Sequence, residues 1–131
     1  KANRYGKTIT ISGSGASAGY VSFHNYPIFA SDCSTIEENH EYSIEYVFYL
    51  LLFVQNKIYK MQTGGAQPHI HPSDLNPLEV LFPKKEIQEE IAIILCDMDN
   101  EIILLRQNLS KYQNIKQGMM QELLTGKTRL I

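Results

Sequence analysis

Two glycine-containing motifs in this sequence could bind a nucleotide phosphate. The first, GSGASAG, spans residues 13–19 and follows the alternating segment KTITIS, and the second, LLTGKTRL, contains Gly126 followed by Lys127 and Thr128. A dinucleotide-binding motif must open a helix whose N-terminus receives the pyrophosphate, yet the β-like segment YVSFHNYPIF follows the first motif. A phosphate-binding loop needs another glycine at the position that Gln121 occupies here. Neither motif therefore predicts a nucleotide site.

The same glycines are better explained by the backbone. We expect residues 13–19 to form a tight connection between two strands, because glycine adopts turn conformations that other residues avoid. We expect Gly126 to end a helix in the left-handed conformation. Lys127 and Arg129 would then lie near the negative end of the helix dipole.

His69 and His71 raise the question of a metal site, since two residues so spaced on a strand could both present imidazole ligands. The candidates for a third ligand are Asp74, His24 and His40. Nothing in the sequence brings any of these three side chains close to the pair. We interpret the two histidines as polar loop residues and predict no metal, while a metal-dependent enzyme stays an alternative that elemental analysis would test.

Composition limits the remaining possibilities. The chain has 131 residues, of which 44% are hydrophobic, and this is enough for one modest core. A net charge of −2 does not predict nucleic-acid binding by itself, although local clusters of Lys and Arg matter more than the total. Cys33 and Cys96 form no C-x-x-C motif, and no nucleophile motif surrounds Ser14, Ser17 or Cys33. The longest apolar run, residues 46–54, is too short to span a bilayer, and without a signal-peptide pattern we expect a cytoplasmic location.

The first 42 residues have the composition of short strands. TITIS and GYVSF alternate between apolar and polar residues, and YPIFAS follows after a turn at HN. From Ser43 the segment SIEYVFYLLLFVQNKIYKM is too long for a strand, so we predict one mostly buried helix with Ser43 as its N-cap and Glu45 in its first turn. A loop rich in Gly and Pro follows, and LEVLF is predicted to form a further strand that ends at Pro83.

The last segment predicts one long helix from Lys85 to Leu124, which would measure about 60 Å at 1.5 Å per residue. Its apolar residues repeat in heptads, with Gln88 and Lys116 as polar exceptions. The predicted interface positions are Ile91, Leu95, Met98, Ile102, Leu105, Leu109, Tyr112, Met119 and Leu123. Such a pattern favours a coiled coil with a second helix, because the helix is far longer than a small core requires.

Two stretches together resemble a known family. Residues 9–36 resemble the central β-rich part of a target-recognition domain, and residues 64–130 resemble the end of that domain and the spacer helix after it. The most specific pieces are PKKEIQEEI, CDMDNEI and LLTGKTRL. On these residues the chain resembles one half of the DNA-specificity subunit of a type I restriction–modification system.

The resemblance implies an α+β fold with two parts. Residues 1–83 would form part of a β-rich target-recognition domain with a buried helix, and residues 84–131 would form the coiled-coil spacer helix. The partners implied are double-stranded DNA, the modification and restriction subunits, and a second spacer helix from another repeat or from a homodimer. The chain would have no catalytic residue and no cofactor, whereas S-adenosylmethionine, ATP and Mg would be bound by partner subunits.

Polar loop side chains are the candidates for DNA contacts, because base edges are read by side chains placed in the grooves. The predicted DNA-binding residues are Asn3, Arg4, Lys7, Ser14, Ser17, Lys60, Gln62, Thr63, Gln67 and His69. Each of them could equally be an ordinary solvated loop residue. The alternative function is a coiled-coil adaptor whose β-rich part binds protein and not DNA.

Overall fold

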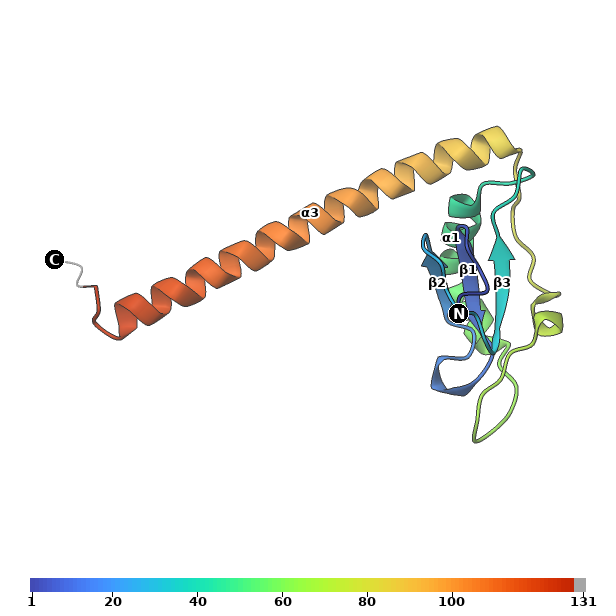
Figure 1. Cartoon of the computed structure of the whole chain (residues 1–131), viewed down its shortest axis with the longest axis horizontal. Coiled ribbons are helices and arrows are strands. Elements are labelled where there is room, and N and C mark those ends of the chain that lie inside the picture. The colour runs from blue at the N-terminus through green and yellow to red at the C-terminus, as the bar shows by residue number, and fades with distance from the viewer. Residues whose placement is uncertain (129–131) are drawn as a thin grey trace. The chain divides into compact units, whose positions relative to one another are not determined.

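The structure, a computed structural model, describes residues 1–128. Its elements are β1 (Thr8–Ser12), the 3-10 turn η1 (Gly15–Ser17), β2 (Val21–His24), β3 (Cys33–Glu37), α1 (Ile44–Phe53), α2 (Gln55–Lys60), the 3-10 turn η2 (Pro72–Leu75) and α3 (Lys85–Leu124) (Figure 1). The chain divides into two compact units, Lys1–Ile93 and Ile94–Ile131. A small antiparallel sheet with helices, followed by one long C-terminal helix, confirms the predicted α+β fold class.

The sheet has the order β2-β1-β3, and both neighbours of β1 are antiparallel to it. In this register Ile9 pairs with Phe23 on one side and with Ile36 on the other. Successive side chains of a strand point to opposite faces, so the alternation in TITIS directs Ile9 and Ile11 into the core. The predicted first strand is therefore confirmed, and its alternation places the core on one face of the sheet.

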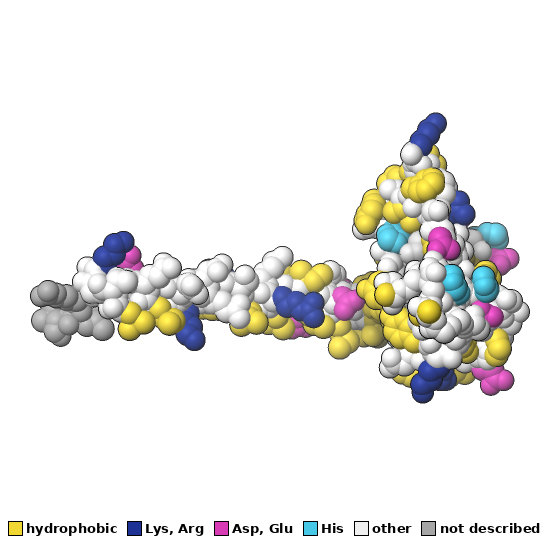
Figure 2. Space-filling view, turned by 90° about the horizontal axis from the view of Figure 1, so that it is seen from below, with side chains coloured by type: hydrophobic (Ala, Val, Ile, Leu, Met, Phe, Trp, Pro, Cys, Tyr) yellow, Lys and Arg dark blue, Asp and Glu magenta, His cyan; other side chains and the backbone are white. Residues whose placement is uncertain are grey.

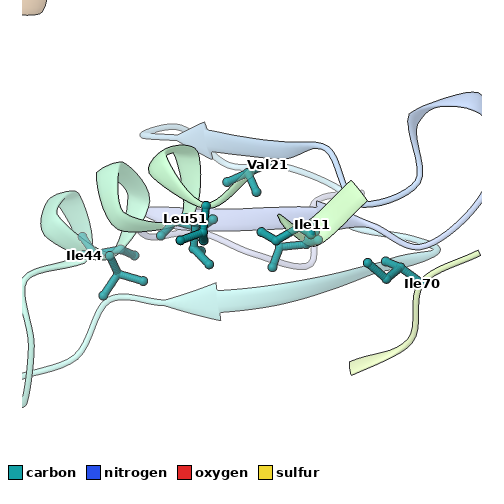
Figure 3. Packing of buried hydrophobic residues seen from close by; sticks show 9 residues of the cluster. Ile11, Val21, Ile44, Leu51 and Ile70 are labelled. Atoms are coloured by element: carbon teal, nitrogen blue, oxygen red, sulfur yellow. The ribbon is translucent and has the colours of Figure 1, made fainter. Parts of the chain in front are cut away.

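The hydrophobic core fills the space between the sheet and α1. Figure 3 shows Leu51 of α1 beside Ile11 and Val21 of the sheet, with Ile44 at the other end of the same helix and Ile70 entering from a loop. Ile9 and Ile58 are fully buried in the same cluster. Loop residue Ile70 thus belongs to the core, which anchors the segment around it.

The predicted helix from Ser43 is interrupted, and this part of the prediction is wrong. Ser43 is the N-cap as expected, because its hydroxyl accepts a hydrogen bond from the backbone N–H of Tyr46. At Val54 the backbone turns to φ −95° and ψ 8°, which ends α1 and starts α2. Val54 and Ile58 are both buried, whereas Phe53 is 87% exposed. The break therefore coincides with buried side chains at Val54 and Ile58, although the local composition favours one continuous helix.

Two predicted strands are absent from the described chain. Within YPIFAS only Ile28 forms a bridge, with Arg4, and Pro27 in this segment lacks the N–H that a strand ladder needs. LEVLF pairs with no strand, and side-chain contacts hold it instead. The Tyr46 hydroxyl donates to the Leu81 carbonyl at 2.9 Å, and the Tyr46 ring meets the Phe82 ring edge-on. Apolar character alone does not supply the neighbouring strand that a ladder requires.

The long helix α3 begins and ends where the sequence predicts. Its first turns belong to the compact unit Lys1–Ile93, in which Gln88 and Ala92 are buried. At the other end Gly126 has φ 71°, and its N–H donates to the Leu123 carbonyl at 3.3 Å. Left-handed glycine is a common helix terminator, so the predicted role of Gly126 is confirmed. Lys127 lies 3.4 Å from Glu122, while Arg129 is outside the described residues.

Replacing Gly19 by alanine is expected to destabilise the first unit by about 2 kcal/mol. Gly19 has φ 77°, and a Cβ there would lie 3.0 Å from Cγ2 of the fully buried Ile58. Chemical denaturation of the two proteins would measure the change. Gly65→Ala is the matched control, because a Cβ at Gly65 meets nothing within 4 Å. Equal stabilities of the two variants would contradict this account of the glycine loop.

Candidate nucleic-acid interface

Two loops that are distant in sequence join into one surface at the end of β1. The first loop is residues 13–19, and the second is residues 61–71; together we call them the two-loop surface. The Gly15 N–H donates to the Pro68 carbonyl at 3.0 Å, and the Ile70 N–H donates to the Gly13 carbonyl at 2.9 Å. Backbone bridges also link His69 to Ser14 and to Thr63. These bonds make the two glycine-containing segments a single structural feature.

Most of the predicted DNA-binding residues lie on this surface. Its loops contain Ser14, Ser17, Gln62, Thr63, Gln67 and His69, and Lys60 ends α2 directly before them. The Gln62 amide donates to the Ala18 carbonyl at 2.7 Å and so ties the second loop to the first. Ser17, Thr63 and Gln67 are exposed. The structure thus collects residues that the sequence could only name separately.

The two-loop surface offers hydrogen-bond donors to an anionic ligand, and α2 beside it offers positive charge. In the described chain, the backbone N–H groups of residues 64–67 donate to no protein acceptor. Lys57 and Lys60 on α2 are exposed and form no ion pair with any residue of the range 1–128. Residues three apart on a helix are neighbours, so these two ammonium groups form a small basic patch beside the loops.

Three predicted residues, Asn3, Arg4 and Lys7, precede β1 and belong to neither loop. Lys7 directly precedes β1, whereas the first loop directly follows it, so the length of the strand separates them, about 15 Å at 3.3 Å per residue. The Asn3 side chain exchanges hydrogen bonds with the backbone of Ala30 at 2.7 and 2.8 Å. Arg4 lies 2.8 Å from a carboxylate oxygen of Glu37. The structure therefore does not bring Arg4 and Lys7 to the two-loop surface, whereas Asn3 is bonded to Ala30, two residues before Asp32.

Lys7 is held by acidic side chains of its own chain. Its ammonium group lies 2.6 Å from Glu45 and 3.7 Å from Glu38. The hydrogen bond to Glu45 raises the pKa of Lys7, and the charges of both carboxylates add to this shift against a smaller effect of burial. Burial alone would raise the pKa of Glu45, but the hydrogen bond and charge of Lys7 and further hydrogen bonds lower it. A phosphate would have to compete with these contacts for Lys7.

Two residues beside the surface were missed by sequence reasoning. Lys57 lies in the last turn of α2, together with Lys60, directly before the second loop. Asp32 lies in the connection before β3, and its carbonyl accepts a hydrogen bond from the Gly13 N–H at 2.9 Å. Asp32 has φ 53°, a conformation that Asp tolerates better than most residues. No local pattern in the sequence links Asp32 to the first loop.

The second unit presents the predicted heptad residues as an open apolar stripe. Leu105 and Leu109 are 59% and 57% exposed, and the other interface positions beyond Leu95 are also partly or largely accessible. Figure 2 shows hydrophobic side chains in yellow along the helix. Ile91 and Leu95 are half-buried. The stripe is the surface that a second helix would cover.

The described residues offer neither a metal-binding cluster nor a membrane-spanning helix. Within residues 1–128, no three His, Cys, Asp or Glu side chains are grouped so that they could hold a metal ion. Among the described helices, none combines the length and the apolar composition that a membrane crossing requires.

Comparisons with known proteins identify the family. The type I restriction modification DNA specificity domain matches residues 1–115. The chain is 27% identical over 112 residues to the type I restriction enzyme MjaVIII specificity subunit of Methanocaldococcus jannaschii, which covers 85% of this chain and 26% of that protein. It is 36% identical over 83 residues to the putative MjaX specificity subunit of the same organism, across 61% of this chain and 20% of that protein.

A solved structure shares the fold. The crystal structure of a type I restriction–modification S subunit from M. genitalium superposes with a TM-score of 0.72 at 25% identity, over 93% of this chain and 33% of that one. The chain thus spans between a fifth and a third of the length of these relatives. Because the family match extends over most of its residues, the chain belongs to the family of type I restriction–modification DNA specificity domains.

Proposed function

We propose that this chain recognises double-stranded DNA in a sequence-specific way, as part of the specificity subunit of a type I restriction–modification complex. The observation that carries the proposal is the two-loop surface, where hydrogen bonds join residues 13–19 to residues 61–71. Beside it lie Lys57 and Lys60, which form no ion pair within residues 1–128. Membership of a DNA specificity family supports the choice of ligand. A fold can serve many functions, so the argument depends on this site.

The groups of the surface divide into two roles. Lys57, Lys60 and the free N–H groups of residues 64–67 are suited to phosphates, which position a protein on a duplex without reading its sequence. Ser14, Gln67 and His69 carry donors and acceptors that could reach base edges. Asn3, Arg4 and Lys7 remain predicted contacts, although each is engaged in bonds within the chain.

Changing both Lys57 and Lys60 to glutamine is expected to weaken DNA binding and to reduce its salt dependence. Each lost phosphate contact should lower the slope of log affinity against log salt by about 0.9 in magnitude. The slope of the full chain on a pool of random duplexes should therefore fall by about 2 in the double variant. Fluorescence anisotropy at several salt concentrations measures it.

The matched control is Lys111→Gln, which removes an exposed positive charge from α3. It should leave the slope unchanged if the duplex contacts the two-loop surface. A salt-independent wild type, or a double variant that behaves like the control, would contradict the proposed interface.

We also propose that α3 pairs with a second spacer helix, either from another repeat or from a second copy of this chain. The exposed heptad stripe supports this pairing. In such a complex the chain would recruit modification and restriction subunits in the cytoplasm, and S-adenosylmethionine, ATP and Mg would be bound by those subunits. The chain itself would have no catalytic role. Helix association without any DNA binding would favour the adaptor alternative.

A further inference from the structure

A cleft of about 240 Å³ opens where three segments of the first unit meet. Gly13 lines it from the first loop, Asp32 from the connection directly before β3, and His69 and His71 from the second loop. The cleft therefore lies partly within the two-loop surface. Its lining combines one carboxylate with two imidazoles, a set of groups that can both accept and donate hydrogen bonds.

Asp32 is held in this cleft by its backbone and by its side chain. Its carbonyl accepts from the Gly13 N–H at 2.9 Å, and its carboxylate oxygen Oδ2 accepts from the Ser14 hydroxyl. A Cβ at Gly13 would lie 2.8 Å from the Asp32 carbonyl oxygen, so glycine is required for this approach. Asp32 has a left-handed φ of 53° in this arrangement. These contacts tie Asp32 to the first loop.

The second carboxylate oxygen of Asp32 is available to a ligand. Asp32 is exposed, and in the described residues no cation pairs with it and no donor other than Ser14 bonds to its side chain. A phosphate would be repelled by this charge. A neutral donor would be attracted, and the exposed amino groups of bases are the donors that a duplex offers in its grooves.

The chemistry of one base pair matches the cleft. In the major groove cytosine presents the N4 amino donor and guanine the N7 and O6 acceptors. Adenine presents an amino donor too, but its usual partners are Asn and Gln, whereas Asp and Glu accept from cytosine N4. A neutral histidine has one ring N–H to donate to the guanine acceptors. We propose that Asp32 reads the cytosine of a single C·G base pair from the major groove, with His69 or His71 facing its guanine. This inference rests on the proposed DNA-binding function.

The test compares Asp32→Asn with the wild-type full chain in selection of binding sites from a random duplex pool, followed by sequencing. Asparagine retains the size of the side chain, the tolerance of left-handed backbone and an oxygen for the Ser14 hydroxyl, but it replaces a carboxylate acceptor by an amide. We expect the preference for C·G at one position of the selected site to be about tenfold weaker in the variant than in the wild type. Other positions and the melting temperature should not change.

Glu79→Gln is the matched control, since Glu79 is an exposed acid outside the cleft and the substitution removes the same charge. Its selected site should equal that of the wild type. If Asp32→Asn selects the same site with the same preferences, Asp32 only holds the first loop, and the inference is overturned while the proposed function stands. Binding of the wild type without any selected sequence would overturn the inference and also the sequence-specific part of the proposed function. Absence of DNA binding by the wild type would remove the proposed function together with the inference.

Discussion

Gln88→Ala is expected to destabilise the first unit by about 3 kcal/mol, because it leaves the backbone N–H of Ser43 and the carbonyl of Pro83 without their hydrogen-bond partner and creates a cavity. Gln88 is 1% exposed. Its Oε1 atom accepts from the Ser43 N–H at 3.0 Å, and its Nε2 atom donates to the Pro83 carbonyl at 2.8 Å. The side chain thereby joins the N-terminus of α1 to the beginning of α3. Thermal denaturation should show a melting temperature lower by about 12 °C or more.

Two further variants separate the causes of this loss. Gln88→Met preserves most of the volume but neither hydrogen bond, so it should recover only the cavity part of the effect. Gln107→Ala is the matched control, because Gln107 is an exposed glutamine of the same helix; surface changes of this kind usually stay within about 0.5 kcal/mol. A Gln88→Ala protein as stable as the Gln107→Ala protein would show that the amide contacts contribute nothing net.

Replacing Leu105 and Leu109 by lysine is expected to abolish helix association. Both side chains lie on the exposed stripe, and burying a leucine contributes about 1.5–3 kcal/mol. Losing two of them, and adding charges where an apolar contact would form, should weaken association by more than about a hundredfold. Sedimentation equilibrium of the full chain measures this change, and circular dichroism checks that α3 remains helical.

The control variant carries lysines at Gln107 and Asn114. At about 100° per residue these two positions lie on the side of α3 opposite Leu105, so they add the same charge away from the stripe. This variant should associate like the wild type. If both double variants associate equally well, the heptad stripe is not the interface, and the coiled-coil proposal is wrong.

The two ends of α3 show how much a local pattern can determine. Lys85–Leu124 contains no proline and, before Gly118, no glycine, so its extent could be predicted from the sequence. Gly126 ends the helix because few other residues accept a positive φ, and this too is a local property. The strand Thr8–Ser12 followed in the same way from its alternation.

The sequence was less informative where long-range packing competes with local preference. The composition of residues 43–61 favours one helix, yet the helix is interrupted at Val54. Val54 and Ile58 are buried, whereas Phe53 is exposed. The run LEVLF has the composition of a strand but found no strand to pair with, and aromatic contacts to Phe82 hold its end instead. Strand propensity is a property of one segment, whereas a β-ladder forms only when two segments pair with each other.

The same difference between local pattern and long-range contact applies to the candidate interface. The sequence alone determined which residue types could contact DNA, that the glycine motifs lack the context of a nucleotide site, and which face of α3 is apolar. Only the tertiary structure decided that residues 13–19 and 61–71 form one surface with Asp32 and Lys57, and that Arg4 and Lys7 are paired with acids elsewhere. The physical reason is that a local pattern depends on neighbours along the chain, whereas a site depends on hydrogen bonds and ion pairs between distant segments. The separation of two segments in sequence does not determine their distance in space.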